Sequence, residues 1–260
     1  MQPYELQWRT FKLKIVEGFQ LAKSVLVRQA AAEFYPVSVA LRQRIKELFG
    51  IDDPEQAVRQ IINEVRNRGD AALLDYTLKI DGVRRGPLEV SKKQRASAYQ
   101  KVDSELVSAL KLAAERIRSF HTAQKESIWS GVTKLKSGQL IRPLERVGIY
   151  IPGGTASYPS TVLMTAIPAR VAGVKEVILV TPPGLNETVS PSTLVAADIA
   201  EVDRIFSVGG AQAIAALAFG TQSIPKVDKI CGPGNIFVVL AKKMVYGVVG
   251  IDGLQGPSEV

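Results

Sequence analysis

The chain has 260 residues and a mass of 28.2 kDa, which is long enough to form one large domain or two smaller ones. Hydrophobic residues make up 46% and charged residues 22% of the chain, and this composition excludes a disordered, a collagen-like and a disulfide-rich protein. The formal net charge of +8 is compatible with nucleic-acid binding, so the distribution of the charge has to be considered.

The excess positive charge lies entirely in residues 1–145, because residues 146–260 contain eight basic and eight acidic side chains. The basic residues of the first part are dispersed, in runs of no more than two, without interleaved aromatic residues for base stacking. This pattern favours a solvated basic face over a nucleic-acid site. Glycine shifts at the same place, with 14 of the 21 glycines in residues 146–260. We therefore predict a mainly helical, basic N-terminal region at 1–145 and a second domain at 146–260.

The cysteine content and the N-terminal residues indicate a cytoplasmic protein. A single cysteine, Cys231, cannot form an internal disulfide, which favours a reducing compartment. Charged residues interrupt every apolar run of the first thirty residues, so no signal peptide is predicted. The uncharged stretch 147–169 is long enough to span a bilayer, but prolines and glycines interrupt it. We expect a soluble globular protein without membrane association.

The first predicted elements are helices. Residues 25–34 and 37–48 look helical, although the periodicity of their apolar residues is mixed. A clearer signal begins at Asp53-Pro54, where an Asp N-cap precedes a Pro at the first helical position and Gln56 at the third. The spacing of the apolar residues that follow predicts a helix. Its apolar positions are Ala57, Ile61, Ile62 and Val65.

Three more helices follow in this part of the chain. Gly69-Asp70 is expected to end the preceding helix and to cap the next one, which carries Leu73, Leu74 and Thr77. Ser91 is expected to cap a third helix, and the longest one runs from Asp103 to about Lys125. Its predicted apolar stripe consists of Leu106, Leu110, Ala113, Ile117 and Phe120.

The pattern changes at Arg146, where short apolar runs begin to alternate with segments of helical length. The predicted strands are 147–151, 177–181, 204–208, 229–231 and 250–252. The predicted helices are 160–174, 190–202, 211–219 and 235–248. Such alternation is typical of a parallel sheet with crossover helices. The predicted fold class is α/β, with a mostly helical N-terminal part followed by a doubly wound, incomplete Rossmann-like parallel sheet.

Four strand ends lead into turns of small residues, at 152–155, 209–212, 232–235 and 256–259. The carboxyl ends of parallel strands lie at one edge of a sheet, so these turns are expected to converge where such folds bind ligands. Glycines there would let backbone amides approach a phosphate at a helix N-terminus, although any one of them alone is explained equally well by a tight turn. Neither a dinucleotide fingerprint nor a P-loop is present, so a nucleotide would be held in another way.

Polar residues in these turns are the candidates for ligand contacts. They are Tyr150, Gln212, Asn235 and Ser258. Each has an alternative explanation: Asn235 and Ser258 are also suitable helix caps, and Tyr150 would also suit a strand with its hydroxyl at the surface.

Cys231 and His121 are two further candidates for a chemical role. Cys231 ends a strand beside a Gly-Pro-Gly turn, where a thiolate of lowered pKa would suit an aldehyde dehydrogenase, but no histidine follows it and lone cysteines are commonly buried hydrophobes. His121 is the only histidine, and no Cys or Glu lies near it at ligand spacing. We expect it to be structural or solvated.

Four motifs make the chain resemble the histidinol dehydrogenase family. They are Arg-Val-Gly-Ile-Tyr-Ile-Pro-Gly-Gly (146–154), Gly-Gly-Ala-Gln-Ala-Ile-Ala-Ala-Leu-Ala-Phe-Gly-Thr (209–221), Pro-Lys-Val-Asp-Lys-Ile-Cys-Gly-Pro-Gly-Asn (225–235) and Gly-Pro-Ser-Glu (256–259). The similarity extends back to about residue 54, through the segments 120–125 and 65–73.

The resemblance implies an NAD-dependent oxidoreductase of the last step of histidine biosynthesis. Such an enzyme oxidises L-histidinol to L-histidine through a bound aldehyde, reduces two NAD molecules, holds its substrate on a zinc ion and forms a homodimer. By their positions in the matching motifs, Tyr150, Gln212 and Asn235 resemble the family's NAD contacts, and Ser258 resembles a contact to L-histidinol.

The family's zinc ligands (a Gln, two His and an Asp) and its Glu-His acid/base pair belong after the Gly-Pro-Ser-Glu motif. No residue of this chain takes those roles, so we assign no catalytic residue and no metal ligand. We expect a fragment of a longer enzyme that is inactive alone. The alternatives are an aldehyde dehydrogenase-like enzyme that uses Cys231 and a non-catalytic binding module.

Overall fold

The computed structural model describes residues 16–26, 38–84, 86–133, 140–153, 156–184 and 188–254. The chain divides into two units, Met1–Ser38 and Val39–Val260. The described part of the first unit contains helix α1 (Phe19–Leu26). The predicted helix at 25–34 lies almost entirely outside the described residues. The predicted domain division between residues 145 and 146 stays a prediction.

Five strands of the second unit form one parallel sheet in the described part of the chain. They are β1 (Arg146–Tyr150), β2 (Glu176–Thr181), β3 (Arg204–Ser207), β4 (Lys229–Cys231) and β5 (Gly250–Ile251). Their order is β3-β2-β1-β4-β5, and every pairing is parallel. The chain therefore builds the sheet outward from β1 on one side and then returns to the other side, which is the doubly wound topology that the sequence predicts.

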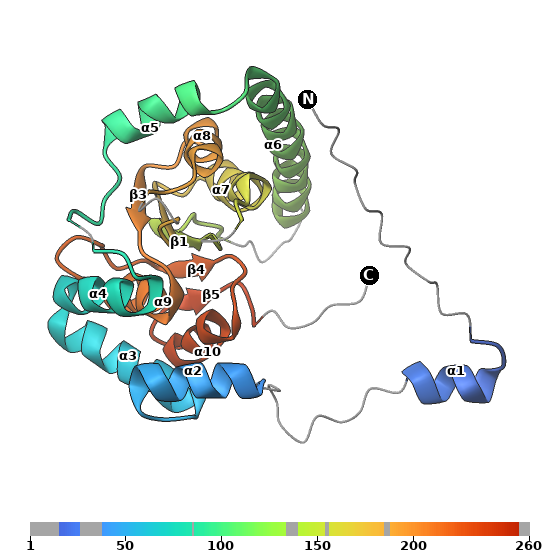
Figure 1. The fold of residues 1–260 in the computed structure, drawn as a ribbon. Helices are drawn as coiled ribbons and strands as arrows, with labels where there is room; N and C mark the ends of the chain where they lie inside the picture. Colours follow the sequence, from blue (N-terminus) through green and yellow to red (C-terminus); the bar gives the residue numbers. More distant parts are fainter. Residues whose placement is uncertain are drawn as a thin grey trace, which may run out of the picture. The chain divides into compact units, whose positions relative to one another are not determined.

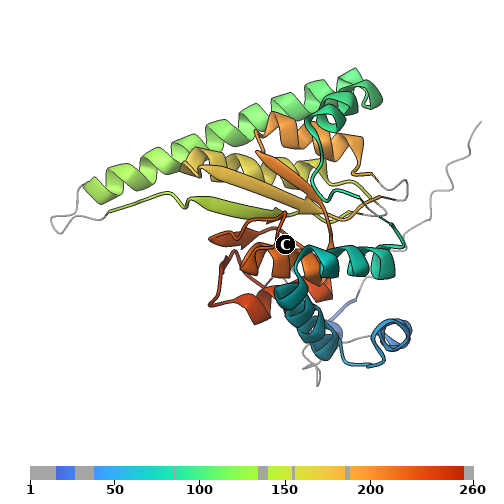
Figure 2. The ribbon, with the colours of Figure 1, turned by 90° about the vertical axis from the view of Figure 1, so that its left-hand side faces the viewer.

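Helices cover both faces of this sheet (Figure 2). The crossover helices α7 (Pro159–Ala172) and α8 (Pro191–Ile199) lie on one face with the long helix α6 (Ser104–Thr133). Helices α9 (Gly210–Phe219) and α10 (Ile236–Val245) lie on the other face with α3 (Pro54–Arg68). All five predicted strands and all four predicted helices of residues 146–260 are present within three residues of their expected bounds.

The remaining elements precede the sheet in the chain. They are α2 (Val39–Phe49), α4 (Asp70–Tyr76), the π-helix η1 (Thr77–Asp81), α5 (Lys92–Ala98) and the 3-10 turn η2 (Tyr99–Lys101). Asp53 caps α3 as predicted, since its carboxylate accepts a hydrogen bond from the Glu55 amide. Ser91 and Gln94 form a capping box at the start of α5. No helix in the described part of the chain is long and apolar enough to cross a membrane.

Gly69 ends α3 and is the N-cap of α4, as predicted for the pair Gly69-Asp70. The Asp70 carboxylate accepts hydrogen bonds from the amide and hydroxyl of Ser223. One detail of the predicted second helix is wrong. Thr77 lies in the π-helix that follows rather than in α4. A π-helix inserts a wider turn, which no apolar periodicity of the sequence indicates.

The predicted apolar stripe of α6 is confirmed at Leu110, Ala113 and Ile117 and wrong at its two ends. Leu106 and Phe120 are exposed, whereas Leu110 and Ala114 are buried. The residues that pack against the core are Val107, Leu110, Ala113, Ala114 and Ile117. The sequence of α6 allows two overlapping apolar faces. Packing against α7 decides which of them is buried.

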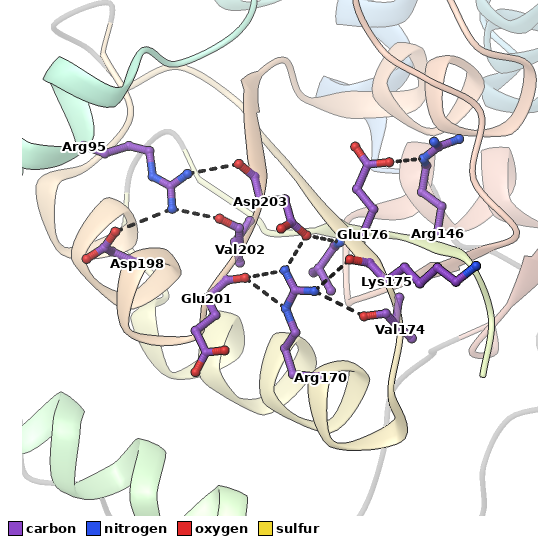
Figure 3. A network of polar contacts seen from close by, with 11 residues as sticks. Arg95, Arg146, Arg170, Val174, Lys175, Glu176, Asp198, Glu201, Val202 and Asp203 are labelled. Atoms are coloured by element: carbon purple, nitrogen blue, oxygen red, sulfur yellow. Dashed lines mark hydrogen bonds and ion pairs between the residues drawn. The ribbon is translucent and has the colours of Figure 1, made fainter. Parts of the chain in front are cut away.

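A network of arginines ties the helices to the amino-terminal edge of the sheet (Figure 3). The guanidinium of Arg170, on α7, donates to the carbonyls of Val174, Lys175 and Glu201 and forms an ion pair with Asp203. Asp203 in turn accepts from the amide of Val177 at 2.6 Å. The end of α7 and the start of β3 are thereby joined to β2, away from the carboxyl edge where the glycine turns lie.

Candidate functional site

The candidate site lies where the order of the strands reverses, between β1 and its neighbour β4. In doubly wound sheets the loops that follow two such strands leave in opposite directions and open a crevice at the carboxyl edge. The corresponding segments here are 151–153 after β1 and 232–235 after β4. Helices α9 and α10 begin at the same edge of the sheet (Figure 1).

Tyr150 ends β1 with its side chain on the α9 side of the sheet. The residue is 4% exposed, and its hydroxyl oxygen accepts a hydrogen bond from the amide of Gly210 at 3.1 Å. The alternative that its hydroxyl lies at the surface is therefore wrong. Burial raises the pKa of Tyr150 to about 12, so the phenol stays protonated at neutral pH and retains a proton to donate.

Gln212 lies in the first turn of α9 and is 1% exposed. Neither its amide nitrogen nor its amide oxygen has a hydrogen-bond partner among the described residues. A buried amide without partners typically destabilises the folded state by about 1–3 kcal/mol, and most buried polar groups are paired. An unpaired donor and acceptor on one side chain therefore point to a ligand that supplies the missing partners.

A cavity of about 260 Å³ lies beside Gln212 and Asn235. Gly210, Ala211 and Phe237 line it on the same side. The other walls come from α2, α3 and η1, and consist of Leu41, Arg44, Ile45, Leu48, Phe49, Ile61 and Ile80. An apolar cavity with a few convergent polar groups is the usual form of a small-molecule site.

Asn235 is both a helix cap and a cavity residue. Its side-chain oxygen accepts hydrogen bonds from the amides of Phe237 and Val238, at 3.1 and 3.2 Å, which makes it the N-cap of α10. The cap interpretation is thus confirmed, while the side chain also lines the cavity with Gln212. The structure therefore brings Gln212 and Asn235 to one cavity and links Tyr150 to its rim through Gly210.

The glycines of these turns are needed for the close approach of the backbone. Gly210 and Gly232 have positive φ angles of +64° and +113°, which favour glycine. A Cβ atom on Gly232 would lie 2.1 Å from the carbonyl oxygen of Tyr150, so no other residue fits there. Gly154, Thr155 and the whole 256–259 turn with Ser258 lie outside the described residues.

Sequence reasoning missed Asp81, the last residue of the π-helix. One of its carboxylate oxygens is buried and has no hydrogen-bond partner in the described part of the chain. Burial raises the pKa of Asp81 to about 6, and the nearby charge of Arg44 opposes this shift. Its charge in turn contributes to the raised pKa of Tyr150. The residue before it, Ile80, lines the cavity, so the π-helix brings a carboxyl group close to the site.

Cys231 and His121 lie away from Gln212, and both line a different cavity of about 400 Å³. Burial, together with the charge of Asp252, raises the pKa of the Cys231 thiol. This is the opposite of the lowered pKa that a nucleophilic cysteine needs. His121 bonds to Gln124 within α6, with 2.9 Å between Nδ1 and Oε1. No group of three His, Cys, Asp or Glu residues among the described positions is arranged to hold a metal ion.

A family model described as histidinol dehydrogenase matches residues 46–260. The chain belongs to the histidinol dehydrogenase family. It is 58% identical over 248 residues to a histidinol dehydrogenase from Dehalococcoides mccartyi (strain CBDB1), an alignment that covers 95% of this chain and 56% of the relative. It is 55% identical over 206 residues to a histidinol dehydrogenase from Methanococcus maripaludis, which covers 78% of this chain and 48% of that relative.

A solved structure in the same family has the same fold. The crystal structure of histidinol dehydrogenase from Elizabethkingia anophelis matches 79% of this chain and 48% of its own length, with a TM-score of 0.72 and 37% identity. The chain thus spans about half the length of the histidinol dehydrogenases that it matches. These matches confirm both the family and the α/β fold class that the sequence predicts.

Proposed function

We propose that this chain carries the NAD-binding part of an enzyme that oxidises L-histidinol to L-histidine through histidinal. The observation that best supports this proposal is the buried, unpaired amide of Gln212 beside a cavity at the carboxyl edge of the sheet. Membership of the histidinol dehydrogenase family supports the choice of NAD and L-histidinol over other nucleotides and alcohols.

Each residue of the proposed site has a task that follows from its position. The cofactor, when bound, accepts hydride from the alcohol carbon of the substrate. Gln212 would donate and accept one hydrogen bond each at the polar edge of NAD inside the cavity. Asn235 and Gly210 lie at the starts of α10 and α9, where helix N-termini favour a negatively charged phosphate. The Tyr150 hydroxyl would hold the start of α9 by accepting from the Gly210 amide, and would donate a hydrogen bond to NAD.

We assign neither a substrate contact nor a zinc ligand to the residues that the structure describes. We propose that Ser258 contacts L-histidinol; it lies outside the described residues. The zinc ion that the family implies does not fit the described side chains, because no three suitable ligands are grouped there. We therefore assign neither a zinc ligand nor a base for the hydroxyl proton to this chain, and derive no step through zinc.

Assembly and location complete the proposal. We propose a homodimer in the cytoplasm, without nucleic-acid or membrane partners. The dispersed basic residues of positions 1–145 support the absence of a nucleic-acid partner, and the lone Cys231 supports the cytoplasm. Membership of the family supports the homodimer.

The test replaces Gln212 by an apolar residue of similar length. Gln212→Met should weaken NAD binding about tenfold or more, measured by isothermal titration calorimetry on the purified chain, because two hydrogen bonds to the ligand are lost. The same change should raise the free energy of unfolding by about 1–3 kcal/mol, because it removes a buried unpaired amide. Greater stability together with weaker binding is the signature of a binding residue.

Gln60→Met is the matched control, because Gln60 is exposed on α3 and bonds to Glu64 within its own helix. It should leave NAD binding unchanged. If Gln212→Met binds NAD as the parent does, the site assignment is wrong.

In a protein that includes the rest of the family's length, Gln212→Ala and Asn235→Ala should raise the KM for NAD more than that for L-histidinol. The 260-residue chain alone should not oxidise L-histidinol.

A further inference from the structure

Lys242 is the one charged side chain among the buried residues that the structure describes. It lies in the middle of α10 and is 2% exposed. A buried ammonium group is strongly destabilising unless it is paired and hydrogen-bonded. Its partners therefore show what holds it inside the protein.

Lys242 and Asp252 together hold the backbone amide and carbonyl of one residue, Gly232. The Lys242 ammonium donates to the Gly232 carbonyl at 3.1 Å and forms an ion pair with one carboxylate oxygen of Asp252. The other carboxylate oxygen of Asp252 accepts from the Gly232 amide at 2.8 Å. The three residues form a closed ring of contacts, which we call the Gly232 clamp.

The Gly232 clamp lies between two residues of the proposed NAD site. Gly232 packs so closely on the backbone of Tyr150 that a Cβ atom would lie 2.1 Å from the Tyr150 carbonyl oxygen. Asn235 follows three residues later and caps α10, the helix that carries Lys242. Lys242 and Asp252 themselves are not among the residues that line the cavity. They therefore act on the site only through the loop.

We propose that Lys242 and Asp252 are positioning residues for NAD, because they fix Gly232 and so hold the 232–235 loop in the conformation that places Asn235 in the cavity with Gln212. This inference rests on the proposed function. A buried ion pair is weak evidence for stability, since apolar pairs of similar volume are often equally stable. Two directed hydrogen bonds to one glycine, in contrast, fix the direction of the chain where it leaves β4.

The test compares Lys242→Met with the matched control Lys243→Met. Lys243 is the next residue on α10, half-exposed, and its ammonium pairs with Glu55 at 2.9 Å. Lys242→Met should raise the Kd for NAD about tenfold in calorimetric titrations, since a charged hydrogen bond that orders the loop is lost. It should also speed hydrogen exchange of the amides of Gly232, Phe237 and Val238. Lys243→Met should change neither the Kd nor the exchange rates.

A double variant separates positioning from stability, and it also serves if Lys242→Met alone does not fold. Lys242→Met with Asp252→Asn removes both charges, so it should unfold at nearly the parent's denaturant concentration. Because the bond to the Gly232 carbonyl is still missing, its Kd for NAD should remain about tenfold above that of the parent. A purely structural pair would recover affinity along with stability.

The outcomes are separable from those of the proposed function. If Gln212→Met weakens NAD binding but the folded Lys242 variants bind NAD as the parent does, the Gly232 clamp has no positioning role and the NAD site stands. Unchanged exchange at Gly232 likewise overturns the clamp. If Gln212→Met has no effect, or the parent does not bind NAD, the proposed site itself is wrong and the positioning role is rejected with it, whatever the exchange rates show.

Discussion

The hydroxyl oxygen of Tyr150 accepts a hydrogen bond from the backbone amide of Gly210, with 3.1 Å between the two atoms, although the residues are 60 positions apart. This bond joins the end of β1 to the start of α9 at the carboxyl edge of the sheet. One of the first amides of α9, which has no partner within the helix, is satisfied in this way.

Tyr150→Phe should loosen the start of α9. The Gly210 amide loses its acceptor, so the free energy of unfolding should fall by about 1 kcal/mol and the Kd for NAD should rise several-fold. Chemical denaturation and calorimetric titration measure the two effects. Tyr246→Phe is the control, because Tyr246 is 70% exposed. This change should alter neither the free energy of unfolding nor the Kd for NAD. Equal NAD affinity in Tyr150→Phe and the parent would contradict a role for this hydroxyl.

Asp81 should make the stability depend on pH in a defined window. Burial raises its pKa from 3.8 to about 6, so between these values the folded protein binds more protons than the unfolded chain. Stability should therefore fall as the pH rises from about 4 to about 6, by about 1–2 kcal/mol, since partial exposure screens the effect. Asp81→Asn should remove this fall in urea titrations at several pH values. Asp75→Asn, at an exposed position, should retain it.

The sheet and its crossover helices were predictable because their signals are local. The runs at 147–151 and 177–181 are short, apolar and rich in β-branched residues, and each leads into a helical segment. The glycine turns after the predicted strands 204–208 and 229–231 also indicated the edge of the candidate site, so Gln212 and Asn235 were selected from the sequence.

The far wall of the cavity was not predictable. Arg44, Ile45 and Phe49 come from a helix whose periodicity is mixed, and only tertiary packing shows that they face α9 and α10. The approach of Asp81 depends on the π-helix at 77–81, which has no sequence pattern of its own. The two wrong positions in the stripe of α6, Leu106 and Phe120, have a similar cause, because packing against α7 decides which of two overlapping apolar faces is buried.

Arg170→Lys should destabilise the amino-terminal edge of the sheet. The guanidinium of Arg170 donates to three carbonyls and pairs with Asp203, and a lysine cannot reproduce that planar set of donors. The free energy of unfolding should fall by about 2 kcal/mol in chemical denaturation. Arg118→Lys is the control, because the Arg118 guanidinium forms an exposed ion pair with Glu201. NAD affinity should be unchanged in both variants, since the network lies away from the cavity.

Cys231 should behave as a buried, unreactive thiol. Burial and the negative charge of Asp252 both raise its pKa, so little thiolate is present at neutral pH. Alkylation by iodoacetamide should therefore be slow at pH 7.5 and should accelerate only at strongly alkaline pH, followed by mass spectrometry on the folded chain. Asp252→Asn should lower the thiol pKa and speed the reaction at pH 7.5. Cys231→Ser should leave the Kd for NAD unchanged, because the thiol lines the other cavity. Rapid alkylation of the parent at pH 7.5 would instead indicate an activated thiolate and revive an aldehyde dehydrogenase-like use of Cys231.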